Sequence, residues 1–69
     1  MKISARNVLK GKIIRVTHGL VDSEIAIELP GGSQIVSTMV KSSSEHLGLA
    51  QGQEVLAIIR GIDVLIALD

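Results

Sequence analysis

Hydrogen-bond donors gather at the start of the chain, in the tetrapeptide Ser4-Ala5-Arg6-Asn7. A hydroxyl, a guanidinium and an amide fall within four residues, and Gly11-Lys12 follows shortly after. Arginine presents its N–H groups in a rigid fork that matches oxygen-rich anions. The segment therefore favours binding of an anion that carries several oxygens. An alternative is that Arg6 and Asn7 only protect the edge of a sheet from pairing with another chain.

Residue types that carry out catalysis or bind metal are scarce in the rest of the chain. There is no cysteine, so thiol nucleophiles, disulfides and thiolate metal sites are excluded. The two histidines, His18 and His46, lie far apart in sequence, and we expect both to occupy exposed turns. No grouping of Ser, His and Asp and no pair of carboxylates on one strand end suggests catalysis. We therefore expect a binding protein with no metal ion or cofactor of its own, rather than an enzyme.

The charge and composition argue against two classes of partner. Seven basic and seven acidic residues give a formal net charge of zero, whereas nucleic-acid binding depends largely on neutralising phosphates. No Phe, Tyr or Trp is present to stack on bases. No apolar run approaches the roughly 20 residues of a membrane span, and the start shows no signal-peptide pattern. We expect a cytoplasmic protein that binds neither nucleic acid nor membranes, with a small nucleic-acid-binding barrel as a disfavoured alternative.

Alternation of polar and apolar residues predicts a single small domain over residues 1–69. The clearest strand runs from Leu20 to Leu29, with acidic residues on one face, and Pro30-Gly31-Gly32 follows as a turn. Further strands are predicted over residues 12–17, 34–40, 54–60 and 62–68. Ser42 and Glu45 have the spacing of a capping box that opens a short helical turn, and Gly48 would end it. The prediction is an all-β fold with one short helical turn, a five-stranded OB-like β-barrel.

The last two predicted strands imply a partner chain. The runs Val55-Leu56-Ala57-Ile58-Ile59 and Val64-Leu65-Ile66-Ala67-Leu68 are apolar on both faces, as in strands that are buried on both sides. A chain this short buries only roughly 60% of its unfolded surface, so its stability alone is marginal. Without disulfides or metals, association with further copies is the remaining way to stabilise the fold. We therefore expect a homo-oligomer.

Five segments, in order and in register, resemble the molbindin (Mop) family. They are Ser4-Ala5-Arg6-Asn7, Leu9-Lys10-Gly11-Lys12, Glu28-Leu29-Pro30-Gly31-Gly32, Leu47-Gly48-Leu49 and Gly52-Gln53-Glu54-Val55. The resemblance covers essentially the whole chain and implies one Mop-type molybdate-binding domain with an OB-like barrel. Free-standing members of this family are hexamers, trimers of dimers, that bind molybdate or tungstate between subunits. The resemblance thus implies cytoplasmic storage or homeostasis of one of these oxyanions, with delivery and sensing left open.

The resemblance also implies a site. The positions that would bind the oxyanion are Ser4, Ala5, Arg6, Ser43, Arg60 and Gly61. Arg60 stands where the family usually has lysine. Two polar positions of the family pattern are lost, because Val40 replaces a threonine and Ile62 replaces a serine. These two replacements support an alternative function, a structural or interaction barrel that has kept the assembly and lost the anion.

The expected site offers hydrogen-bond donors only. Molybdate at neutral pH is a tetrahedral dianion whose oxygens all accept hydrogen bonds. Arg6 and Arg60 would supply charged donors, and serine hydroxyls would complete the set. Because no carboxylate is expected among them, the site would discriminate against a phosphate that carries a proton. Alternatively, Ser43 only caps the helical turn and Arg60 is an ordinary surface residue.

Overall fold

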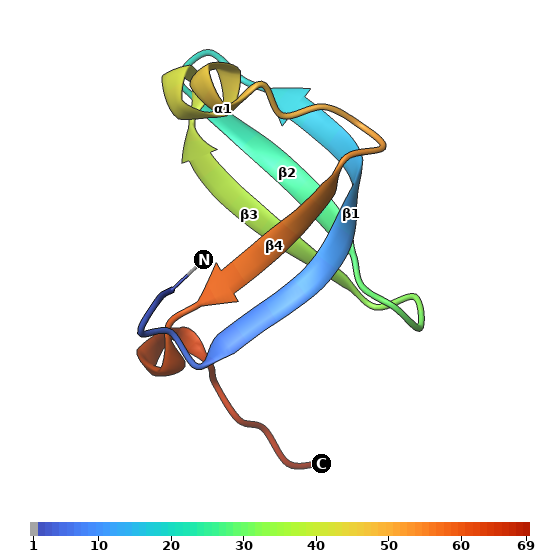
Figure 1. Ribbon diagram of the computed structural model, residues 1–69, viewed down its shortest axis with the longest axis vertical. Helices are drawn as coiled ribbons and strands as arrows, with labels where there is room; N and C mark the ends of the chain where they lie inside the picture. Colours follow the sequence, from blue (N-terminus) through green and yellow to red (C-terminus); the bar gives the residue numbers. More distant parts are fainter. Residues whose placement is uncertain (1) are drawn as a thin grey trace.

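The computed structural model describes residues 2–69 and folds them into one curled antiparallel sheet with two short helices (Figure 1). The elements in chain order are β1 (Asn7–His18), β2 (Asp22–Glu28), β3 (Gln34–Val40), α1 (Lys41–Leu47), β4 (Glu54–Ile59) and the 3₁₀ helix η1 (Gly61–Asp63). The all-β class with one short helix is therefore confirmed. No helix within residues 2–69 has the length and apolar character that a membrane span requires.

The long strand β1 lies inside the sheet and gives it its curl. The strand order is β3-β2-β1-β4. The second half of β1 pairs with β2, whereas its first half pairs with β4, and Lys12 at the changeover has Glu28 and Glu54 as its two cross-strand neighbours. The register with β2 shifts between Ile13 and Arg15, an irregularity of the kind that bends a strand. The result is an open half-barrel, with β3 and β4 as its free edges (Figure 1).

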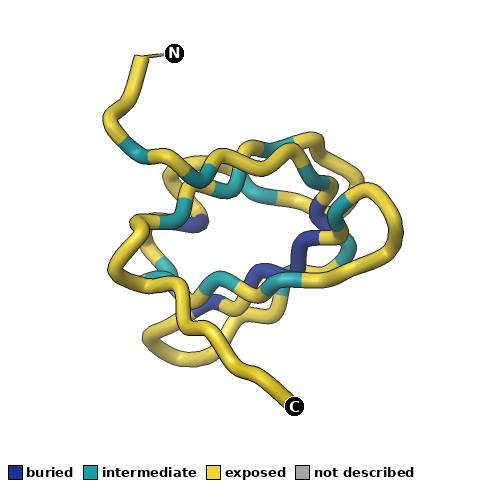
Figure 2. Tube along the Cα trace, turned by 90° about the horizontal axis from the view of Figure 1, so that it is seen from below, coloured by how far each residue is buried: buried dark blue, intermediate teal, exposed yellow. Residues whose placement is uncertain are grey.

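The concave side of this sheet holds a small aliphatic core (Figure 2). Ile13, Ile25 and Ile27 are buried in it, and seven partly buried hydrophobic residues pack against them. The alternation predicted for the second strand is confirmed, because Ile25 and Ile27 are buried while Glu24 and Glu28 are exposed. Ala26 departs from this alternation, since it is buried as well. Among the described residues, the buried core cluster holds only three large side chains, so the interior of the single chain is small.

Helix α1 begins differently from the prediction. Its N-cap is Val40, which makes no side-chain capping bond, so the predicted capping box of Ser42 and Glu45 is wrong. The helix follows directly from β3, and the Lys41 N–H donates to the Val21 carbonyl at 2.7 Å. That bond satisfies one of the four N–H groups at the start of the helix that have no partner within it. The predicted end is confirmed, because Gly48 has the left-handed φ of 66° that favours glycine.

The predicted fifth strand over residues 62–68 is not formed. Residues 61–63 make η1, and the segment 64–69 (the tail) runs extended away from the sheet (Figure 1). Leu65, Ile66 and Leu68 are each at least 90% exposed. Within residues 2–69, no backbone hydrogen bond reaches residues 65–69. The prediction of a strand buried on both faces is therefore wrong for the tail of the single chain.

Candidate functional site

A cleft of about 530 Å³ lies at one end of the sheet, between the residues that precede β1 and those that follow β4. Its lining residues are Ile3, Ser4, Ala5, Arg6, Ile58, Arg60, Gly61 and Ile62. The register explains this meeting, because Asn7 at the start of β1 pairs with Ile59 at the end of β4. Antiparallel pairing therefore brings the flanking segments, far apart in sequence, to the same edge of the sheet. Five of the six predicted site residues line this one cleft.

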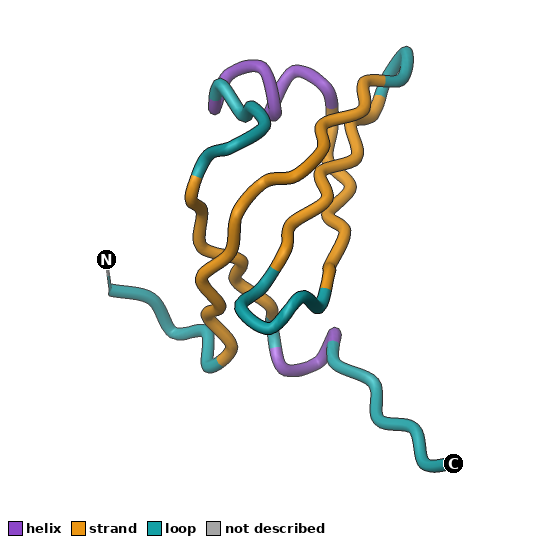
Figure 3. Tube along the Cα trace, turned by 90° about the vertical axis from the view of Figure 1, so that its right-hand side faces the viewer, coloured by secondary structure: helices purple, strands orange, loops and turns teal. Residues whose placement is uncertain are grey.

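Ser43, the sixth predicted residue, lies elsewhere. It is an exposed residue of α1, which follows β3 and sits at the opposite end of the sheet from η1 (Figure 3). Val40, the residue before α1, is at that same far end and is 53% exposed. The cleft of a single chain therefore does not contain Ser43.

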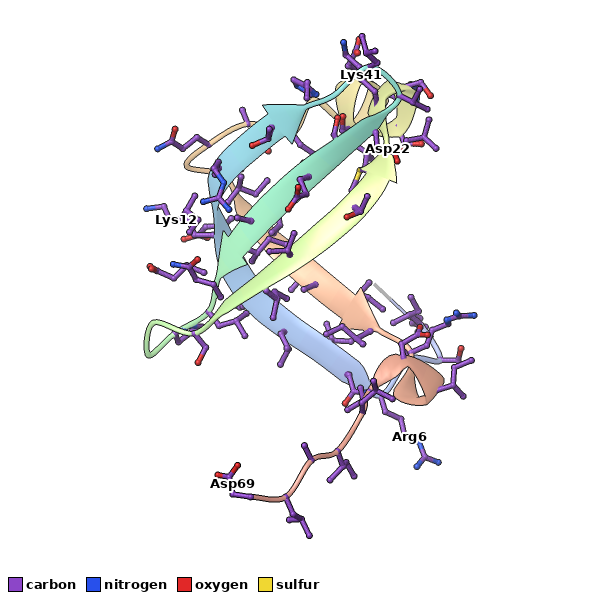
Figure 4. The ribbon with its side chains drawn as sticks, turned by 180° about the vertical axis from the view of Figure 1, so that it is seen from behind. Arg6, Lys12, Asp22, Lys41 and Asp69 are labelled. Atoms are coloured by element: carbon purple, nitrogen blue, oxygen red, sulfur yellow. The ribbon has the colours of Figure 1, made fainter. Side chains whose placement is uncertain are left out.

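Two guanidinium groups give the cleft its positive charge. Arg6 projects outward near η1, far from Lys12 on the other side of the molecule (Figure 4). Arg6 forms no ion pair with other residues of the described chain. Ser4 is exposed beside it, and Ala5 is half-buried. The arrangement provides a guanidinium and a hydroxyl on exposed residues of the cleft lining.

Arg60 differs from Arg6, because a carboxylate already engages it. Its Nε donates to Asp63 Oδ2 at 2.9 Å, and its Nη2 lies 3.4 Å from Asp63 Oδ1. The two side chains remain 72% and 50% exposed, and η1 holds them three residues apart in sequence. An acceptor thus lies directly beside one of the two cations, although Asp63 is not among the residues that line the cleft. The signal in the sequence was an acidic residue three positions after Arg60, the spacing at which side chains in a helical turn can pair.

Ile62 occupies the place where a further hydroxyl was expected. Its side chain lines the cleft and is 80% exposed. An exposed isoleucine contributes no hydrogen bond to an anion and instead adds apolar surface to the cleft. Among the described residues, no group of three or more His, Asp or Glu side chains is placed to hold a metal ion.

A buried polar network near α1 was also missed by sequence reasoning. Ser44 Oγ donates to Ser23 Oγ at 2.9 Å, and Ser23 Oγ lies 2.7 Å from His18 Nδ1. Both hydroxyls are almost completely buried. The sequence shows that Ser23 belongs to the alternating strand and Ser44 to the run of serines. It does not show that the two side chains are in contact. The network is structural, because it faces the interior rather than the cleft.

Comparison with known proteins shows the family of the chain. The model of the TOBE domain matches residues 3–66. The chain belongs to the TOBE domain family. Molybdenum-pterin-binding protein 3 of Clostridium pasteurianum is 46% identical over 66 residues, which are 96% of this chain and 97% of that protein. The predicted resemblance to the Mop family is confirmed by such relatives, which are named as binding proteins rather than enzymes.

Solved structures agree with this assignment. MopII from Clostridium pasteurianum has a TM-score of 0.91 and 40% sequence identity, covering 97% of this chain and 100% of that chain. The cytoplasmic molybdate-binding protein ModG, with molybdate bound, has a TM-score of 0.82 and 42% identity, covering 87% of this chain and 43% of that chain. The curled sheet described above is therefore the Mop fold.

Proposed function

We propose that the protein binds molybdate or tungstate reversibly, at sites formed between copies of the chain. One observation carries the proposal: the cleft gathers Ser4, Ala5, Arg6, Arg60 and Gly61, the positions at which the resemblance to the Mop family implies an oxyanion site. The molybdate-binding neighbours of the same fold support this choice of ligand. Tungstate is included because it is a tetrahedral dianion like molybdate, and hydrogen-bond donors alone would treat the two alike.

The chemistry of capture would be electrostatic and reversible. Arg6 supplies an unpaired guanidinium, and charge-assisted N–H···O⁻ bonds are roughly twice as strong as neutral ones. The hydroxyl of Ser4 and the backbone N–H groups of Ala5 and Gly61 are the neutral donors of the set. Exposure of the cleft weakens each of these bonds in a single chain, because water screens the charges. A partner chain that covered the cleft would strengthen them.

The location of Ser43 supports an interface site. Ser43 belongs to α1, which lies at the opposite end of the sheet from η1 and the cleft (Figure 3), so it could contact the same anion only in the cleft of a second copy. We assign it to the cleft of a neighbouring subunit. On this proposal the single chain carries an incomplete site, and anion binding depends on assembly.

The tail supports the same assembly. Val64 is extended, with φ of −96° and ψ of 119°, and the apolar residues after it are almost fully exposed. A free edge of a neighbouring half-barrel would give the tail both backbone partners and an apolar surface. Such exchange would supply the missing fifth strand from another chain. The proposed assembly is the hexamer of the Mop family, a trimer of dimers, acting in the cytoplasm to store or buffer the oxyanion.

Differential scanning calorimetry of the assembled protein tests the proposal. A ligand that binds only the folded assembly stabilises it by mass action, by about 2.7 kcal/mol at 100 times its dissociation constant. We expect the melting temperature to rise with sodium molybdate and not with sodium chloride of equal ionic strength. If the melting temperature of the assembled protein does not change at saturating molybdate, oxyanion binding is refuted.

A second candidate function is a structural or interaction barrel that has lost the anion. Ile62 in the cleft wall favours it, because this side chain stands where a hydroxyl donor is expected and is 80% exposed. Replacing Ile62 with serine separates the two functions. Under the binding proposal, Ile62→Ser modifies an affinity that already exists. Under the structural alternative, molybdate binding is absent from the natural protein and appears, if at all, only in the variant.

A further inference from the structure

The ion pair between Arg60 and Asp63 has a consequence for how tightly the cleft holds an anion. We infer that Asp63 acts as an internal counter-anion, which competes with the bound oxyanion for the guanidinium of Arg60 and lowers the affinity of the site. The inference rests on the proposed function, because it concerns the same cleft. It deepens that proposal by naming a residue that sets the affinity without contributing a donor.

The geometry of the pair carries the argument. Asp63 occupies the edge of the guanidinium formed by Nε and Nη2, the edge at which a tetrahedral oxyanion would also receive two hydrogen bonds. An oxyanion on that edge must displace the carboxylate. An oxyanion on the remaining edge, formed by Nη1 and Nη2, shares the guanidinium with a negative charge a few ångströms away. Either arrangement weakens binding, because the Asp63 carboxylate and the oxyanion compete for the same guanidinium of Arg60.

The charge balance leads to the same conclusion. Arg6 and Arg60 line the cleft, whereas Asp63 lies beside it and pairs with Arg60. The carboxylate therefore offsets part of the positive charge that Arg60 offers to a dianion. Because both side chains are at least half exposed, the pair itself is weak and reversible, which suits a carboxylate that yields to a ligand. The ion pair orients the Arg60 side chain when no anion is bound, and it limits how tightly the anion is retained.

Isothermal titration with Asp63→Asn tests the inference. The amide keeps the size of the side chain and removes its charge. We expect molybdate to bind the variant more tightly than the natural protein, by about threefold to tenfold at low ionic strength, and by less in high salt. Asp69→Asn is the matched control, since it removes the same charge from the end of the tail and should leave the affinity unchanged. The oligomer mass is measured for all three proteins.

Perchlorate provides a second readout, because it has the same tetrahedral shape and only one charge. A charge effect acts twice as strongly on the free energy of a dianion as on that of a monoanion. The gain in Asp63→Asn should therefore be larger for molybdate than for perchlorate. An equal gain for both anions would point to a steric effect and overturn the inference.

The outcomes separate the inference from the proposed function. If the natural protein binds molybdate and Asp63→Asn binds it equally or more weakly, the inference is wrong and the proposed function stands. If only the variant binds, the carboxylate blocks the site, so the inference holds and the proposed function is refuted for the natural protein. If neither assembled protein binds molybdate, both are refuted.

Discussion

Ser44 and Ser23 join the helix α1 to the strand β2 through a hydrogen bond of 2.9 Å between their buried hydroxyl oxygens. Ser44 Oγ also lies 2.9 Å from the Lys41 carbonyl oxygen, and Ser23 Oγ is in contact with His18. Each hydroxyl thus has partners on two sides in a region that excludes water. A buried polar group that loses its partner costs more than the bond contributes, so this pair should be sensitive to truncation.

Replacing Ser44 with alanine leaves Ser23 without its partner on α1. We expect the free energy of unfolding to fall by about 1–2 kcal/mol. Urea denaturation followed by circular dichroism measures the change, at one fixed protein concentration because the oligomer makes stability concentration-dependent. The control is Ser42→Ala on the exposed side of the same helix, which should change stability by no more than about 0.5 kcal/mol. Equal effects of the two variants would show that the hydroxyl pair contributes nothing specific.

Gly11 allows close packing where β1 exchanges one partner strand for the other. A Cβ at this position would collide with Ile27 Cγ2 and lie 3.0 Å from the Glu28 carbonyl oxygen. We expect Gly11→Ala to destabilise the protein by about 1–3 kcal/mol, as overpacked cores do. Gly61→Ala is the control, since no atom lies within 4 Å of its added Cβ. The two variants are compared by thermal unfolding, and similar melting temperatures would contradict the packing role of Gly11.

The tail provides a test of assembly. Ile66 is 90% exposed in the single chain, so a lysine there has no contact to disturb unless another copy covers it. We expect Ile66→Lys to shift the protein from the oligomer to smaller species in sedimentation velocity. Asp69→Lys places the same positive side chain three residues further along and should leave the mass unchanged. An Ile66→Lys protein that keeps the full oligomer mass would rule out the tail as an interface.

Mixing two defective proteins tests whether a site is shared between chains. Arg6→Ala and Ser43→Ala should each weaken molybdate binding. If Arg6 and Ser43 act in one site from different subunits, refolding the two variants together in equal amounts restores about a quarter of the sites to the natural donor set. Titration of the mixed oligomer counts these restored sites. A mixture that binds no better than the two separate variants would place both residues in the site of one chain or remove Ser43 from the site.

Much of the fold follows from sequence patterns, and the exceptions have physical reasons. Residues 34–40 form a strand with the predicted bounds, because β-branched residues follow a clear glycine turn. The strand β1 begins at Asn7, five residues before the predicted start, because Val8 and Leu9 are exposed and only pairing with β4 makes this part a strand. The predicted strand over residues 62–68 is not formed in the single chain. Apolar character predicts that a segment is buried, but it does not specify which strand pairs with it.

The candidate site was predictable to a similar degree. Ser4, Arg6 and Arg60 meet because they flank a pair of antiparallel strands, which is a relation that sequence analysis can anticipate. The capture of Arg60 by Asp63 depends on the turn of η1, and this turn was not expected, because residues 62–68 were predicted to form a strand. Ser43 could not be assigned from one chain, because its proposed partner residues belong to another copy.

The most direct test of oxyanion binding is isothermal titration of the purified, assembled protein with molybdate, repeated with sulfate and phosphate. Three proteins are compared: the natural chain, Arg6→Ala, and Lys12→Ala, which removes a cation far from the cleft (Figure 4). We expect the natural chain and Lys12→Ala to bind molybdate equally, and Arg6→Ala to bind at least about tenfold more weakly while keeping its oligomer mass. A flat trace from the assembled natural protein, or equal binding by all three, would contradict the proposed site.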